Sequence, residues 1–108
     1  MDAQLKRGLL DACLLAILTR GESYGYKISQ SAERFMPVSE STLYPVLRRM
    51  EQQGYLETRQ QEHNGRLRKY YRITPGGEDR LRVFRTEWGE IKRMVDYVMG
   101  EDRNDDAQ

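Results

Sequence analysis

Net positive charge is concentrated in one part of this chain, from residue 39 to residue 73. This segment holds seven arginines and lysines against four acidic residues, a net charge of +3. Arg48 is followed downstream by a closely spaced group, Arg66, Arg68 and Lys69. Cations gathered on one surface bind phosphate oxygens, so this pattern predicts a phosphate-binding segment. An ordinary solvated surface is the alternative, because charged residues are common on every small protein.

The net charge of the whole chain does not reveal this basic segment. The 108 residues carry a formal net charge of only +1, because residues 101 to 108 contribute −3. The C-terminal stretch from Gly100 on has no apolar pattern and is predicted to be a disordered tail. The length is sufficient for one domain with one core.

Few residues in the sequence are suited to catalysis or metal binding. His63 is the only histidine, and Cys13 is the only cysteine and lies among leucines, which favours a small, buried, apolar role. The sequence has no metal-ligand cluster and no phosphate-cradling glycine loop, so we expect neither an enzyme nor a bound cofactor. The longest apolar run, residues 12 to 18, is far too short to span a bilayer. We therefore expect a cytoplasmic protein that makes no membrane contact.

Two helices are predicted ahead of the basic segment. The first covers residues 4 to 19 and carries apolar side chains on more than one face, so it should be buried on two sides. The second begins with Ser23 as its N-cap and runs to Phe35, with Ile28, Ala32 and Phe35 pointing inward.

A third helix is predicted to begin at Ser39 or Ser41 and to end at Gln53. Its inward residues, spaced as on one helical face, are Leu43, Val46, Leu47 and Met50. Its opposite face carries Ser41, Pro45, Arg48 and Gln52, with Tyr44 at the edge. That face can approach base edges and phosphates. Pro45 lacks a backbone donor, so it must lie near the start of the helix or bend it.

Two strands, residues 55 to 61 and 67 to 73, are predicted to follow this helix. Asn64 and Gly65 between them form a strong hairpin-turn signal, because both tolerate positive φ. A helix followed by a basic hairpin is the order that a winged helix-turn-helix uses to hold duplex DNA. The predicted fold is therefore mainly α with a small β-hairpin.

A long C-terminal helix is predicted to begin with Thr74 as N-cap and Pro75 in the first turn. Apolar residues then repeat with the alternating spacing of a coiled coil. They are Leu81, Phe84, Trp88, Ile91, Val95 and Val98. A helix roughly 37 Å long is longer than this small core can cover, so the seam predicts a homodimer. The alternative is packing against the first helix of the same chain.

The predicted elements divide the chain into three parts. Residues 1 to 74 form a winged helix-turn-helix domain, residues 75 to 99 a dimerisation helix, and residues 100 to 108 an acidic tail.

Several short motifs resemble the PadR family of bacterial transcriptional regulators, in particular its short subgroup with a single C-terminal helix. They are Tyr24-Gly25-Tyr26, Ser41-Thr42-Leu43-Tyr44-Pro45 and Arg66-Leu67-Arg68-Lys69-Tyr70-Tyr71. The resemblance covers residues 5 to 99. Leu67 departs from it, because many members have proline there; the basic residues of the hairpin are retained.

The resemblance implies a homodimeric repressor of a near-palindromic operator. The third helix would enter the major groove, and the hairpin would contact adjacent phosphates or the minor groove. The residues expected at the DNA are Lys27, Ser41, Thr42, Tyr44, Pro45, Arg48, Arg66, Arg68 and Lys69. Of these, Thr42 and Tyr44 would bond phosphate, and Arg48 would reach guanine or phosphate. Arg49 is expected to be either a solvated residue or an intramolecular ion-pair partner.

The resemblance also implies release of DNA by a phenolic or planar aromatic effector. Trp88, with Phe84 one turn before it, would stack such a ligand between subunits, and Asp11 would contribute to an acidic rim. The alternative is that Trp88 only anchors the dimer core.

A different class of function also fits the sequence: a winged-helix module that binds another protein. The basic residues favour DNA, because phosphate contacts require cations. Binding that weakens steeply with salt would indicate DNA, and salt-insensitive binding would indicate a protein partner.

Overall fold

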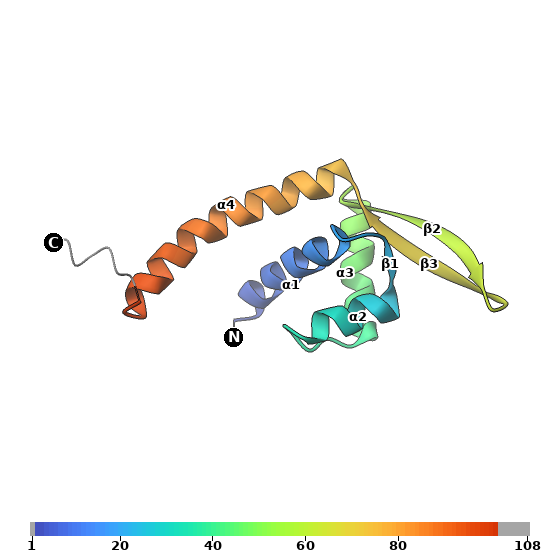
Figure 1. Cartoon of the computed structure of the whole chain (residues 1–108), viewed down its shortest axis with the longest axis horizontal. Coiled ribbons are helices and arrows are strands. Elements are labelled where there is room, and N and C mark those ends of the chain that lie inside the picture. Colours follow the sequence, from blue (N-terminus) through green and yellow to red (C-terminus); the bar gives the residue numbers. More distant parts are fainter. Residues whose placement is uncertain (1, 102–108) are drawn as a thin grey trace.

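The computed structural model describes residues 2 to 101, which form four helices and a three-stranded antiparallel sheet (Figure 1). In chain order the elements are α1 (Ala3–Leu18), β1 (Ser23–Tyr24), α2 (Gly25–Glu33), α3 (Glu40–Gln52), β2 (Leu56–His63), β3 (Arg66–Ile73) and α4 (Pro75–Val98). This is the predicted winged helix-turn-helix with a long C-terminal helix, with one strand more than expected. Most of the predicted acidic tail lies outside the described residues.

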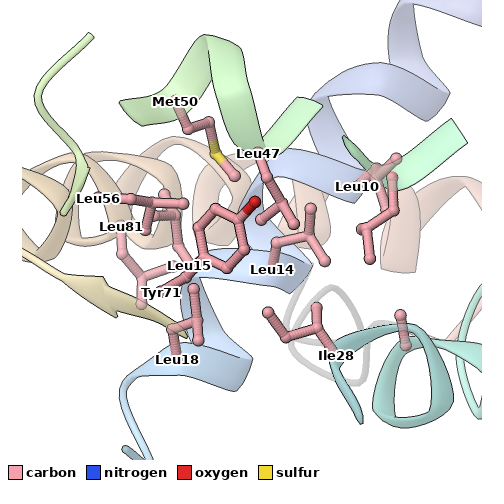
Figure 2. Close-up of a cluster of buried hydrophobic side chains, with 12 residues drawn as sticks. Leu10, Leu14, Leu15, Leu18, Ile28, Leu47, Met50, Leu56, Tyr71 and Leu81 are labelled. Carbon is pink, nitrogen blue, oxygen red and sulfur yellow. The ribbon is translucent and has the colours of Figure 1, made fainter. Parts of the chain in front are cut away.

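The core lies between the first three helices and the base of the sheet. Figure 2 shows Tyr71 of β3 among leucines of α1 and α3. The inward stripe of α3 is confirmed, because Leu43, Leu47 and Met50 are all buried. Shortening such a leucine to alanine costs about 2–5 kcal/mol, so this stripe holds α3 firmly against the body.

The predicted start of the second helix was wrong. Ser23 does not cap it but pairs with Tyr71, and Tyr24 pairs with Tyr70, so both belong to the edge strand β1. The sheet order is β1-β3-β2. The helix begins only at Gly25, after the extended backbone of Tyr24.

The predicted end of this helix was also wrong. The helix stops at Glu33, and a turn follows in which the amides of Phe35 and Met36 both donate to the Ala32 carbonyl. The Phe35 ring therefore leaves the inward stripe and is 71% exposed. Met36 and Val38 pack against the core in its place.

Helix α3 begins at a cap. The Ser39 hydroxyl accepts from the Thr42 amide, so the earlier of the two predicted starts is correct. Pro45 is in the second turn. There its nitrogen cannot donate to the Ser41 carbonyl, so one intrahelical bond is missing on the outer face.

The hairpin of β2 and β3, called here the wing, projects from the body (Figure 1). Its turn is as predicted, with φ of 52° at Asn64 and 81° at Gly65. Each strand extends one or two residues closer to the turn than predicted, so that His63 pairs with Arg66.

Helix α4 begins as predicted, with the Thr74 hydroxyl accepting from the Gly77 amide. Gly77 is required by close packing. A methyl group there would lie 2.7 Å from Ile73 Cγ1 and would overlap the Tyr55 carbonyl.

The two halves of α4 differ in burial. Leu81 and Phe84 are buried, and α4 lies against α1. The second half runs away from the body (Figure 1), and its apolar residues are exposed. They are Ile91, Met94, Val95, Tyr97 and Val98. Packing against α1 therefore covers only the first part of the predicted seam.

Candidate nucleic-acid interface

A groove lies between α3, the start of α2 and the wing. Its volume is 840 Å³. It is lined by Tyr24, Gly25, Tyr26, Glu40, Tyr44, Arg48, His63, Asn64, Arg66, Leu67, Arg68, Lys69 and Tyr71. The structure thus brings five of the predicted DNA-binding residues to one surface from two separate elements.

The basic residues of the central segment fall into two groups. Four are paired with carboxylates: Arg49 with Asp11, Arg59 with Glu22, Lys69 with Glu51, and Arg72 with Glu57. Among residues 2 to 101, no carboxylate lies within ion-pairing distance of Arg48, Arg66 or Arg68. These three all line the groove. Within the central segment, the positive charge that has no carboxylate partner among the described residues therefore lies in the groove.

Arg49 and Lys69 illustrate the paired group. Both oxygens of Asp11 accept from Arg49, at 2.7 Å and 2.9 Å, so Arg49 is the intramolecular partner that was one of the two expectations. Lys69 lines the groove, but its Nζ is 3.5 Å from a Glu51 oxygen. Glu51 also accepts from the Thr58 hydroxyl, which ties the wing to the end of α3.

Tyr44 joins the two helices of the helix-turn-helix. Its hydroxyl donates to Glu40 Oε2 at 2.9 Å. Burial, and then this hydrogen bond, raise the pKa of Tyr44, so the hydroxyl keeps its proton. The ring packs so closely on Gly25 that an added methyl group would lie 2.6 Å from the hydroxyl oxygen. A bond from this hydroxyl to phosphate therefore requires exchange of the Glu40 bond.

Small hydroxyls surround the start of α3. The Ser39 hydroxyl lies 3.0 Å from that of Ser41 and donates to Thr42 Oγ1 at 3.1 Å. Ser41, Thr42 and Pro45 are exposed, but they lie on α3 outside the lining of the groove.

Lys27 is not placed with the other predicted DNA-binding residues. It lines a separate hollow of 520 Å³ formed by the end of α1 and by α2, beside Arg20, Arg34 and Phe35. Its position on α2 turns its side chain away from the groove. Lys27 and the groove residues could therefore contact the same DNA only if the protein covered a longer stretch of the duplex.

Several residues of the groove lining were not among the predicted DNA-binding residues, and two of them make contacts that organise the site. Glu40 holds the Tyr44 hydroxyl, and the Tyr24 ring lies beneath the Arg68 guanidinium, 3.9 Å away. The sequence did contain a signal for Tyr24, because this residue belongs to the Tyr24-Gly25-Tyr26 motif that resembles the PadR family. For Glu40 the only signal in the sequence was its position in the first turn of a helix.

The three residues predicted for an effector do not form one open site within a single chain. Asp11 is held by Arg49, and Phe84 is buried with the Arg80 guanidinium 4.5 Å from its ring. Trp88 is half-buried, where α4 leaves the body.

Other chemistries find little support in the described residues. Residues 2 to 101 contain no group of three or more histidine, cysteine or acidic side chains placed to hold a metal ion. Burial raises the pKa of the Cys13 thiol, which opposes formation of the reactive thiolate. None of the helices in this part of the chain has both the length and the apolar character needed to cross a membrane.

The arrangement of three helices, a wing and a long last helix defines a winged-helix regulator with an appended α4. The model of the transcriptional regulator PadR-like family matches residues 14–83. The chain therefore belongs to the PadR-like family of transcriptional regulators.

Individual relatives and solved structures are similar to this chain over two thirds of its length or more. The transcriptional regulator Rv3488 of Mycobacterium tuberculosis is 39% identical over 75 residues, which are 68% of this chain and 70% of that protein. The structure of smu.1704 from Streptococcus mutans UA159 is 44% identical, with a TM-score of 0.77 over 88% of this chain and 91% of that one. A PadR-like transcriptional regulator from Bacillus cereus is 34% identical, with a TM-score of 0.79 over 90% of this chain and 97% of that one.

Proposed function

We propose that this protein is a homodimeric repressor that binds a near-palindromic operator through the groove and α3. The observation that carries the proposal is the position of Arg48, Arg66 and Arg68. Among the described residues, these are the basic groups of the segment without a carboxylate partner, and all three line one groove. A duplex supplies the anions that such a surface lacks.

The first half of α3 would supply the contacts to bases. Helix-turn-helix proteins place the N-terminal part of the second helix in the major groove. Here that part carries Ser41, Thr42 and Pro45 on its exposed face, and Arg48 one turn later. Arg48 would reach a guanine edge or a phosphate, while Arg66 and Arg68 would bind the backbone beside it.

The second half of α4 would form the dimer. Val95 and Val98 are 49% and 79% exposed in the single chain, and they continue the seam that begins with the buried Leu81. A second copy would cover both. Two-fold symmetry would then place the two α3 helices at half-sites about 34–36 Å apart, or at a multiple of that distance.

Binding to the protein's own promoter region tests the proposal. A mobility shift is measured with the promoter fragment and with a random fragment of equal length, at two salt concentrations. A discrete, promoter-selective complex that weakens steeply with salt is expected. Weak binding that is equal on both fragments would contradict the repressor. Salt-insensitive capture of a protein would indicate the interaction-module alternative.

An effector would act at the dimer end of the molecule, where Trp88 lies half-buried. We propose that Trp88 stacks a planar aromatic compound once a second subunit completes the site. Because Trp88 is the only tryptophan in the sequence, its fluorescence reports this site alone. Quenching by planar phenolic compounds, with parallel loss of the DNA complex, is expected. Unchanged emission across a broad compound panel would leave Trp88 as a dimer-core anchor.

A further inference from the structure

A row of four side chains crosses one face of the sheet. Tyr24 on β1 is directly opposite Tyr70 on β3, and their rings meet edge to face with centroids 5.7 Å apart. The Arg68 guanidinium lies 3.9 Å from the Tyr24 ring centroid. The Arg59 guanidinium lies 4.7 Å from the Tyr70 ring centroid. Each tyrosine thus supports one arginine.

The two ends of the row differ in charge. Glu22 accepts from Arg59 Nε at 3.0 Å and also from a terminal nitrogen, which neutralises that end within the protein. In the described part of the chain, no carboxylate lies within ion-pairing distance of Arg68, and Arg68 and Tyr24 both border the groove. The Arg59 end is therefore a closed ion pair, while the Arg68 end borders the groove.

We propose that Tyr24 is a positioning residue that holds Arg68 for a phosphate of the operator; this inference rests on the proposed DNA-binding function. A guanidinium lying on a ring keeps its N–H donors free, because they lie in its own plane. The ring also restricts the long arginine side chain before DNA arrives, so less rotamer freedom is lost on binding. Tyr24 itself needs no contact with the DNA.

A double-mutant cycle on the promoter fragment tests this role, with affinity measured over a series of salt concentrations. Tyr24→Leu removes the ring and keeps the charge, so affinity should fall roughly two- to fivefold with an unchanged salt slope. Tyr24→Phe keeps the ring and should bind as the wild type does. Arg68→Ala should flatten the salt slope by about 0.9 units for each subunit, and therefore by about 1.8 units for the homodimer. Adding Tyr24→Leu to Arg68→Ala should cause no further loss.

Two further variants guard against simple misfolding. Arg68→Lys keeps the charge but not the planar group, so it should weaken binding by a similar factor with the Tyr24 ring intact. The double change Glu22→Gln and Arg59→Gln removes the other ion pair and leaves the net charge unchanged. It disturbs the same face and should leave DNA affinity unchanged.

The possible outcomes separate the inference from the function on which it rests. Wild-type affinity in Tyr24→Leu, or an equal loss in the Arg68→Ala background, would overturn the positioning role. A loss in Tyr24→Phe would overturn it too, because the hydroxyl would then contact DNA directly. A wild-type protein that binds no DNA at any salt concentration would instead remove the proposed function, and the inference with it.

Discussion

The groove and the second half of α4 both contain side chains that have no partner in the described part of the chain, but the two sets are of opposite chemistry. Among residues 2 to 101, no carboxylate forms an ion pair with Arg66 or Arg68 in the groove, and no core covers Val95 and Val98. An exposed cation is well solvated, whereas apolar surface costs about 25 cal/mol for each Å² left in water. The groove can therefore remain unoccupied until DNA binds, whereas the second half of α4 is expected to be covered permanently by a second subunit.

The difference also predicts opposite responses to salt. Ions screen the attraction between the groove and a polyanion, but they do not weaken apolar association. DNA binding and dimerisation can thus be separated in the same protein, and the following changes test that separation.

The largest effect is expected from Ile91→Asp combined with Val95→Asp. Two carboxylates would be buried in the proposed dimer seam, so the protein should become a monomer. Operator affinity should then fall by more than about a hundredfold, because simultaneous binding of two half-sites is lost. Light scattering after size exclusion gives the mass, and Arg93→Asp is a control on the same exposed stretch of α4. A dimer that persists would show that the seam is wrongly assigned.

Arg48→Ala is expected to have the next largest effect. If Arg48 contacts a base, specific binding should weaken by about 1–3 kcal/mol, and the preference at that base should relax. The melting temperature should hardly change, because the side chain is exposed and has no carboxylate partner among the described residues. Affinity for operator variants, measured by titration, checks both statements. Wild-type affinity would remove Arg48 from the interface.

Its neighbour Arg49 should respond in the opposite way. Arg49→Ala would leave the mostly buried Asp11 carboxylate without its partner, so stability should fall by about 1 kcal/mol. DNA affinity of the folded protein should be nearly unchanged. Thermal unfolding with parallel binding assays tests the contrast, and an intact melting temperature with weak DNA binding would place Arg49 at the DNA.

The smallest expected effect is a difference in salt slope between variants of two adjacent residues of the wing. Arg68→Ala should lower the salt slope by about 1.8 units, as expected for one lost phosphate contact in each subunit of the homodimer. Lys69→Ala should lower it by less, because Glu51 already neutralises that ammonium group. Equal slopes in the two variants would mean that DNA displaces the Glu51 ion pair.

Local patterns were enough to predict most of the fold. Helical periodicity located α1 and α3, Asn64-Gly65 located the turn of the wing, and Thr74-Pro75 located the start of α4. Strand β1 could not be found in this way, because two residues have no period and pair only with distant residues of β3. Phe35 was misplaced because its spacing continued the stripe of α2 beyond the point where the helix ends.

The groove was predictable only in part. Helical phase placed Arg48 on the outer face, and composition identified the wing as basic. Which cations stay without partners could not be read from the sequence. The deciding ion pairs join distant elements, as Arg49 of α3 with Asp11 of α1, and Arg59 of β2 with Glu22. The stack of Arg68 on Tyr24 depends in the same way on the unforeseen strand β1.

The exposed second half of α4 also has a thermodynamic consequence. If a second copy covers this helix, part of the free energy of folding is supplied by association, and it follows the law of mass action. Diluting the protein should then lower its melting temperature, although no contact within the chain has changed. A regulator built in this way is least stable when it is scarce, so its lifetime in a cell would depend on its own abundance.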